Sequence, residues 1–302
     1  MATQPINRLK LYFGIVFLCL LTLNGCTPKN NSESHTETRE FTDFRGRTLT
    51  LPIRPQRIVS ASPAITEIIF ALHQGSRIIG RTDFCQYPPE EVSTIPSIGG
   101  LNNTNHETIV ALEPDVVIAS SIVSKEMVDK IEAAHIPVVC LPERKTVEGT
   151  LEIIAAVGTI LGADSMAAEL NNSIRKELTA ITKNIDTTHR PTVYYVVGFG
   201  QGGDFSAGKD TYIHDLIGLA GGKNIAGDVE GWSYSKEKLF EHNPDYIFIR
   251  QEDFERFIST APYNKLKAVK KKHVFPIESA LMDLQTPRSV EAIRYISEKI
   301  HR

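Results

Sequence analysis

Alternation of apolar runs with amphipathic stretches is the dominant pattern of this chain. Short runs such as RIVSAS (57–62) and DYIFIR (245–250) have the length and β-branched content of strands covered on both faces. Strands are predicted at 57–62, 77–82, 115–120, 137–142, 191–198, 245–250 and 273–277, and a leading hairpin at 41–52. Helices are predicted between them at 64–74, 107–113, 125–135, 210–222, 236–242 and 289–300. Strands that alternate with helices predict parallel sheets with helices on both faces.

One long amphipathic segment divides this pattern into two halves. At 164–185 the apolar side chains recur at steps of 3 and 4, which places Met166, Leu170, Ile174, Leu178, Ile181 and Ile185 on one helical face. Asp164 is the predicted N-cap, and such a helix is roughly 33 Å long. The predicted fold is therefore α/β: a lobe at 41–160 and a lobe at 189–302, both Rossmann-like, joined by one long rigid helix within 161–188. A ligand cleft is expected between the lobes, at the carboxyl ends of the strands.

The first 40 residues carry a different pattern. Arg8 and Lys10 precede an apolar run that ends in LNGC at 23–26, the order of a secretory signal peptide, and the run is too short for an ordinary membrane span. Cys26 after Leu-Asn-Gly resembles the lipobox of bacterial lipoproteins, which predicts a signal peptide at 1–25 and lipidation of Cys26; plain secretion with an incidental Cys26 is the alternative. The polar stretch that follows predicts a flexible tether at 26–40.

Charge and cysteine content limit the expected binding partners and disulfide bonds. The net charge is −3, and the one basic cluster, KAVKKKH at 267–273, is interpreted as a solvated helix end, so nucleic acid is not an expected partner. With Cys19 in the signal and Cys26 lipidated, Cys85 and Cys140 remain. A first-lobe strand order of 2-1-3-4 would place them on opposite edge strands, roughly 14 Å apart, and therefore as free thiols.

Enzyme and metal signatures are weak in this sequence. No Gly-x-Ser-x-Gly, Walker-type loop or His-Glu-x-x-His is present, and GFGQGG (198–203) lacks the helix that a phosphate-binding loop needs directly after it. None of the nine histidines forms an i, i+4 ligand pair, and only His106 is expected near the cleft. The sequence therefore predicts neither catalysis nor a metal held by the protein's own side chains.

Aromatic side chains gather in the segments expected to border the cleft: Phe84, Tyr87, Phe199, Phe205, Trp232 and Tyr234. Such rings supply flat walls for a large planar ligand. Packing within their own loops is the alternative interpretation.

A phrase occurs twice, at 105–118 (NHETIVALEPDVVI) and at 235–248 (SKEKLFEHNPDYIF). In each copy a capping residue, Asn105 or Ser235, stands two places before a glutamate, Glu107 or Glu237. A carboxylate in the first helical turn is already favoured by the helix dipole. The repetition in both lobes suggests in addition a pseudo-two-fold surface that meets a two-fold partner.

Several segments carry a family resemblance: RIVSASPAITEIIFAL, RIIGRTDFCQYPPE, IPSIGGLNNTNHETIVALEPDVVIA and FSAGKDTYIHDLIGLAGGKNI. Together they resemble the class III periplasmic-binding proteins of bacterial ABC importers, which carry cobalamin, haem and iron–siderophores. DFCQYPPE and GWSYSKE are most similar to the cobalamin-binding members. The resemblance covers about 41–300.

The resemblance implies a lipid-anchored, exported, monomeric protein that captures cobalamin or a related corrinoid and delivers it to a dimeric ABC permease with its ATPase. An iron–siderophore or haem carrier is the alternative, with Tyr87, Tyr234 or His106 as axial ligands for haem; an enzyme on the same scaffold is the rival of another class. Tyr87, Phe205 and Trp232 match corrin-site positions, and Glu107 and Glu237 match the glutamates that dock the permease. The chain departs from the family where Ile98-Gly99-Gly100 replaces an expected Trp, and where Ala280 and Leu284 replace an expected Asp and Arg.

Overall fold

The computed structural model describes residues 37–101, 103–183, 185–186 and 188–301. The part of the chain from Glu37 onward forms one compact unit. The predicted signal peptide, the proposed lipidation site Cys26 and most of the predicted tether lie outside the described residues. The tether was predicted to extend to residue 40, but strand β1 (Thr38–Thr42) already pairs antiparallel with β2 (Thr48–Pro52), so the folded part begins before the predicted boundary.

The first lobe contains a four-stranded parallel sheet with the order β4-β3-β5-β6. This is the predicted 2-1-3-4 order. Its strands are β3 (Ile58–Ala61), β4 (Ile78–Arg81), β5 (Val116–Ser120) and β6 (Val138–Leu141). The helices of this half are α2 (Pro63–Ala71), α3 (Pro89–Ser93), α4 (His106–Ala111) and α5 (Lys125–Glu132).

The second lobe repeats this topology. Its sheet has the order β10-β9-β7-β8 and is parallel throughout, so numbering its strands from β7 again gives 2-1-3-4. The strands are β7 (Thr192–Val196), β8 (Lys223–Asn224), β9 (Tyr246–Arg250) and β10 (Val274–Ile277). The helices are α8 (Tyr212–Leu219), α9 (Lys236–His242), α10 (Phe254–Ser259), α11 (Lys267–Lys270), α12 (Ser279–Asp283) and α13 (Ser289–Ile300). The two lobes therefore share one strand order, as the repeated phrase suggested.

Alternating side chains give each sheet two apolar faces. In the first lobe Ile58 and Ile118 pack against α2 and α6, whereas Val59 and Val117 pack on the side of α4 and α5. The second lobe divides in the same way: one face packs on α8 and α13, and the other on α9 and α10. Burial on both faces explains why the strands are continuous apolar runs in the sequence.

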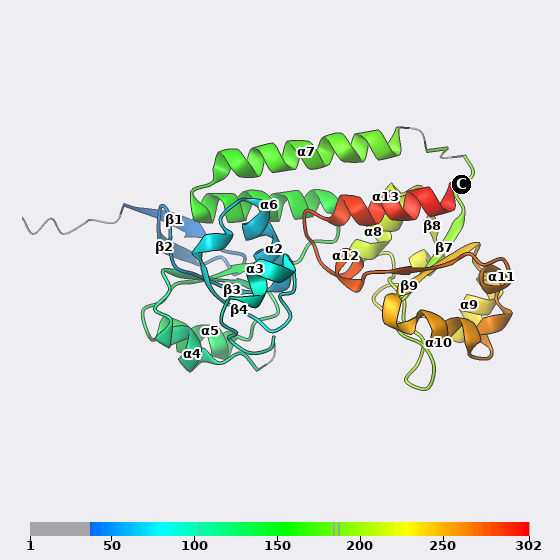
Figure 1. Cartoon of the computed structure of the whole chain (residues 1–302), viewed down its shortest axis with the longest axis horizontal. Coiled ribbons are helices and arrows are strands. Elements are labelled where there is room, and N and C mark those ends of the chain that lie inside the picture. Colours follow the sequence, from blue (N-terminus) through cyan, green and yellow to red (C-terminus); the bar gives the residue numbers. More distant parts are fainter. Residues whose placement is uncertain (1–36, 102, 184, 187, 302) are drawn as a thin grey trace, which may run out of the picture. The chain divides into compact units, whose positions relative to one another are not determined.

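Two helices, not one, run alongside the lobes. The predicted connecting helix is α7 (Asp164–Thr182), and α6 (Val147–Leu161), which the sequence reading left unassigned inside 41–160, packs beside it (Figure 1). Gly158 permits the close approach, because a Cβ there would lie 2.5 Å from the Cβ of Ala167. Gly162 ends α6 in the left-handed conformation (φ 65°).

Each of the two helices contacts both lobes. Val147 at the start of α6 belongs to the core of the second lobe, whereas Leu151 and Ile154 belong to that of the first. On α7, Ile174 packs in the first lobe and Ile181 against the second. The predicted apolar face of α7 is thus largely confirmed. Asp164 is not the N-cap: Ala163 holds that position, and Asp164 accepts a hydrogen bond from the Thr159 hydroxyl instead.

The Pro-Asp of the repeated phrase has a structural role in both lobes. Asp115 precedes β5, and its carboxylate accepts hydrogen bonds from the backbone N–H groups of Gln56 and Arg57 at 2.6 and 2.9 Å. Asp245 precedes β9 and accepts from the N–H and the hydroxyl of Thr192 at 3.1 and 2.6 Å. Each aspartate therefore joins the third strand of its lobe to the start of the first.

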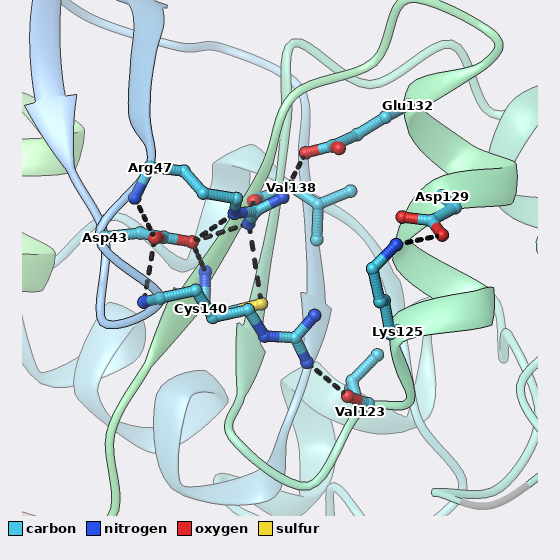
Figure 2. A network of polar contacts seen from close by, with 9 residues as sticks. Asp43, Arg47, Val123, Lys125, Asp129, Glu132, Val138 and Cys140 are labelled. Carbon is cyan, nitrogen blue, oxygen red and sulfur yellow. Dashed lines mark hydrogen bonds and ion pairs between the residues drawn. The ribbon is translucent and has the colours of Figure 1, made fainter.

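A buried aspartate fixes the β1–β2 hairpin to the first lobe (Figure 2). The Asp43 side chain has no exposed surface and forms an ion pair with Arg47 at 2.5 Å. Arg47 also reaches Glu132 of α5 at 2.8 Å and the Val138 carbonyl at 2.8 Å. Burial alone would raise the pKa of Asp43, but the hydrogen bonds and charge of Arg47 outweigh it and lower the pKa. Asp43 is therefore ionised at neutral pH.

Cys85 and Cys140 are free, as predicted, and both are buried. Cys140 lies on the edge strand β6, but Cys85 lies four residues beyond the end of β4 and not on that strand. Cys85 lies within 3.2 Å of the hydroxyl groups of Thr66 and Thr82. Cys140 lies on β6, 3.8 Å from the Arg47 guanidinium, and burial raises the pKa of its thiol.

Candidate functional site

A cavity of about 580 Å³ lies where strands of both lobes end. Ser120 at the end of β5 and Leu141 at the end of β6 line it from the first lobe, and Val197 and Arg250, from the ends of β7 and β9, line it from the second. The carboxyl ends of parallel strands are where such sheets bind ligands, and the volume lies in the range typical of small-molecule sites. The cleft that the sequence predicted is therefore present as a cavity bordered by both lobes.

The cavity lining carries three cationic and three acidic side chains: Arg144, Lys145, Arg250, Glu143, Asp210 and Asp283. Each cation has a carboxylate partner. Arg144 pairs with Glu152 at 3.0 Å, Lys145 with Asp210 at 3.5 Å, and Arg250 with Asp283 at 2.7 Å. The lining therefore has little net charge to offer a ligand.

The Arg250–Asp283 pair is the least exposed of these ion pairs, with side chains 31% and 29% exposed. The Tyr195 hydroxyl lies 3.3 Å from the second carboxylate oxygen of Asp283. Burial raises the pKa of Asp283, although Arg250 acts in the opposite direction. The Arg250 Nε atom is buried and has no hydrogen-bond acceptor among the described residues.

Of the six aromatic residues predicted to line the cleft, Trp232 does so. Its side chain is 49% exposed, and its carbonyl accepts a hydrogen bond from the N–H of Ser206 at 2.9 Å. This contact holds the Trp232 segment beside Phe205, which is 37% exposed and outside the lining. Phe84 and Tyr87 are also exposed and outside the lining, and the Tyr87 ring lies 4.0 Å from the Arg288 guanidinium.

Two of the predicted wall residues are core residues of the second lobe instead. Tyr234 is 1% exposed, and its hydroxyl hydrogen-bonds to His242 and to the Ile225 carbonyl. Phe199 packs edge-on against Phe257 and Tyr263. Both rings therefore pack in the core of the second lobe, which leaves Tyr234 unsuited as an axial ligand. The glycine-rich segment 198–203 is likewise outside the lining.

Sequence reasoning missed the charged and apolar residues at the strand ends. Arg250 is the last residue of β9, and Ser120 is the last of β5. Each was the final residue of a correctly predicted strand, so the rule that ligands bind at carboxyl ends would have selected both. Leu284, where the family resemblance led us to expect an arginine, lines the cavity as well.

The lobes are joined near the cavity by polar contacts, of which one ion pair is buried. Arg288, which precedes α13, forms a bidentate pair with Glu67 of α2 at 2.9 and 3.0 Å, and the two side chains are 10% and 5% exposed. The Arg144 N–H donates to Gln285 at 2.7 Å, and the Val147 N–H donates to Asp215 at 2.8 Å. These contacts hold the two walls of the cavity together.

The two glutamates of the repeated phrase occupy equivalent places. Glu107 is the second residue of α4 and Glu237 the second of α9; both are exposed, and each helix leads into the third strand of its sheet. Asn105 and Ser235 are the N-caps, as predicted. The pKa of Glu237 is lowered, first by a hydrogen bond from its own backbone N–H and then by Ser235.

Neither a metal centre nor a membrane span is found in the described part of the chain. Residues 37–301, apart from the gaps at 102, 184 and 187, hold no cluster of three or more His, Cys, Asp or Glu side chains suited to a metal ion. His106 begins α4 and is outside the cavity lining. Among the same residues, no helix combines the length and apolar character needed to cross a bilayer.

The chain belongs to the periplasmic binding protein family, whose model matches residues 58–281. A substrate-binding lipoprotein of an ABC transporter in Bacillus subtilis, YvrC, is 26% identical over 95% of both chains. The cobalamin-binding protein of Halobacterium salinarum is 31% identical over 68% of this chain and 56% of its own length. The haem-binding protein RhuT of Roseiflexus shares the fold with a TM-score of 0.73, at 24% identity over 82% of this chain and 98% of its own. The family consists of substrate-binding proteins of transporters, so this protein is a substrate-binding partner of an ABC permease and its ATPase.

Proposed function

We propose that this protein captures cobalamin or a related corrinoid in the cavity and delivers it to an ABC importer without catalysing a reaction. The observation that carries the proposal is a cavity bordered by both lobes in which each cationic side chain is already engaged by a carboxylate. Such a lining suits a large ligand whose polar groups are mainly uncharged, and the side chains of a corrin ring are carboxamides. The similarity to the Halobacterium cobalamin-binding protein supports the same ligand class.

Haem or an iron–siderophore is the second candidate, favoured by the fold shared with haem-binding RhuT. Haem carries propionate carboxylates, and ferric siderophores are commonly anionic. A carboxylate that enters an apolar cavity loses hydration and needs a cation in return. Because Arg144, Lys145 and Arg250 are each engaged by a carboxylate, the lining favours the corrinoid.

Affinity in this proposal comes from a preformed site. The α6–α7 pair contacts both lobes, and the buried Glu67–Arg288 pair joins them. Little conformational freedom is then lost when a rigid ligand enters. Trp232 provides an exposed aromatic wall, and the exposed rings of Phe84, Tyr87 and Phe205 are further candidates for contact with a large ligand that protrudes from the cavity.

Glu107 and Glu237 are proposed to dock the permease. They occupy the same position of the same helix in two lobes with one strand order, so they form a matched pair of exposed carboxylates. A two-fold permease offers two equivalent cationic pockets to such a pair. The protein is proposed to act as a monomer, exported and held at the membrane by a lipid on Cys26.

Titration of Trp232 fluorescence with cyanocobalamin, haemin and a ferric hydroxamate tests the ligand. Trp232 is the only tryptophan and lines the cavity, so a bound corrinoid, which absorbs in the emission range, should quench its fluorescence. We expect cyanocobalamin to bind with at least tenfold higher affinity than the other two. Failure of every corrinoid to bind would refute the proposal.

Docking is tested by the variant with both Glu107→Ala and Glu237→Ala in a cell that depends on this importer for uptake. Uptake should fall by about tenfold or more while affinity for the ligand is unchanged. The matched control is Glu148→Ala with Glu291→Ala, which removes first-turn glutamates of α6 and α13 on the opposite faces of the two sheets. Equal loss in both double variants, or loss of ligand affinity, would contradict a docking role.

A further inference from the structure

We propose that Arg250 and Asp283 together form a carboxamide-recognition site in the cavity wall, which selects ligands that carry amides over ligands that carry carboxylates. The inference rests on the proposed function and names the polar groups that determine its specificity. It concerns residues that the sequence reading did not select, from the end of β9 and the end of α12.

Geometry places a donor and an acceptor side by side in the cavity wall. Arg250 Nη2 and Asp283 Oδ2 are 2.7 Å apart, and both residues line the cavity together with Val197, Met282 and Leu284. A guanidinium only donates hydrogen bonds, and a carboxylate only accepts them. A primary carboxamide offers one carbonyl acceptor and an NH₂ donor, so it is the neutral group that satisfies both members of the pair at once.

The pair has hydrogen-bonding capacity left unused. A guanidinium has five N–H donors and a carboxylate about four acceptor sites, so their mutual contact and the Tyr195 hydroxyl do not use all of them. The Arg250 Nε atom itself is buried and has no acceptor among the described residues. Tyr195 donates its hydroxyl to Asp283 and thereby holds the carboxylate at the wall. Because Arg250 and Asp283 both line the cavity, a ligand carboxamide can meet the remaining N–H donors of the guanidinium and the remaining lone pairs of the carboxylate.

The same pair disfavours a carboxylate on the ligand. A carboxylate on the ligand would be attracted by Arg250 but repelled by the negative charge of Asp283. Because the cavity wall is partly desolvated, this repulsion is strong. The other ion pair that lies wholly within the lining, Lys145–Asp210, is longer at 3.5 Å and more exposed at 69% and 37%, so solvent screens it. Arg250 and Asp283 are therefore the groups of the lining best suited to this discrimination.

The test compares ligands that differ only in amide against acid. Cyanocobalamin is compared with its monocarboxylic acid derivatives, and haemin with its diamide, by fluorescence titration and calorimetry on the mature protein. The wild type should bind the amide member of each set about tenfold more tightly than the acid. Asp283→Asn removes the repelling charge and should lower the ratio of amide affinity to acid affinity to about one or below. Arg250→Gln leaves the negative charge of Asp283 without its cationic partner and should raise this ratio.

Opposite changes of the affinity ratio in the two variants distinguish ligand recognition from a structural role. A structural role would weaken the binding of both ligands of a set equally. Glu252→Gln is the matched control: it makes the same charge change near the pair but outside the lining, and should leave the ratio at its wild-type value. If no corrinoid binds while the haemin set shows the predicted shifts, the proposed cargo is wrong and the recognition site stands. Ratios that stay within twofold of the wild type in both Asp283→Asn and Arg250→Gln would overturn the inference.

Discussion

At the scale of single residues, the molecule uses acidic side chains for two different tasks. Asp43, Asp115 and Asp245 accept hydrogen bonds from backbone and cationic groups and join separate segments. Glu107 and Glu237 are exposed at the first turn of matched helices and do not join separate segments among the residues that the structure describes. The Pro-Asp of the repeated phrase is therefore explained by folding, and its glutamate by the proposed docking.

Asp245 should make the stability of the protein depend on acid pH. Burial alone would raise its pKa, but Thr192 and Lys267 outweigh it and hold the pKa at about 2, against 3.8 in the unfolded chain. Its stabilising contribution is then complete above pH 4 and is lost as the pH falls towards 2. Because the side chain is 39% exposed, we expect Asp245→Asn to lower the free energy of unfolding by only about 1 kcal/mol at pH 6.

Urea unfolding of the wild type and of Asp245→Asn between pH 6 and pH 2.5 measures this contribution. The difference between the two proteins should narrow as the pH falls. A difference that is constant over this range would show that the lost charge is not its source.

At the scale of elements, the β1–β2 hairpin depends on one carboxylate. Asp43→Ala leaves the N–H groups of Arg45 and Arg47 without their acceptor and removes the buried partner of the Arg47 guanidinium (Figure 2). We expect a loss of about 3 kcal/mol in the free energy of unfolding. Asp129→Ala is the control, since it removes an exposed pair with Lys125 and should cost less than about 0.5 kcal/mol. Equal losses, measured by chemical denaturation, would contradict the anchoring role of Asp43.

Most strands and helices could be predicted because the sheets are buried on both faces. That burial makes β3, β5 and β9 compact apolar runs, and capping residues such as Asn105 and Ser235 mark helix starts. Helix α6 was not predicted, because it is buried around most of its circumference and includes Gly149 and Gly158. Its sequence therefore shows no clear amphipathic period. Its partner α7 has one solvent face and was found.

The position of the cavity between the lobes was predicted, but only some of its lining residues were. Aromatic side chains in loops have two destinations, a ligand site or the core beneath the loop, and sequence position does not separate them. Trp232 lines the cavity, whereas Tyr234, only two residues further along the chain, is buried in the core. Arg250 belongs to the lining because it ends β9, which the strand-end rule could have indicated, whereas Asp283 ends α12 and reaches the cavity through a three-dimensional arrangement that local pattern does not encode.

At the scale of the whole folded unit, the Glu67–Arg288 pair determines how firmly the lobes are coupled. Both side chains are nearly buried, and Glu278 contacts the same guanidinium at 3.3 Å. Burial alone would lower the pKa of Arg288, but Glu67 outweighs it and raises the pKa, so the guanidinium stays charged throughout the physiological range. The Tyr87 ring covers the guanidinium from one side. Removing one member leaves a buried charge with only a weaker partner.

Glu67→Gln should therefore destabilise the protein and loosen the lobes together. We expect a loss of about 3 kcal/mol in the free energy of unfolding and a broader distance distribution between spin labels at Lys125→Cys and Lys271→Cys. Glu177→Gln is the control, because its pair with Arg294 links α7 to α13 but is 41% and 47% exposed. It should change neither quantity measurably. If Glu67→Gln lowers stability while the distance distribution stays as narrow as in the wild type, the α6–α7 pair alone keeps the lobes in register and the ion pair contributes only to stability.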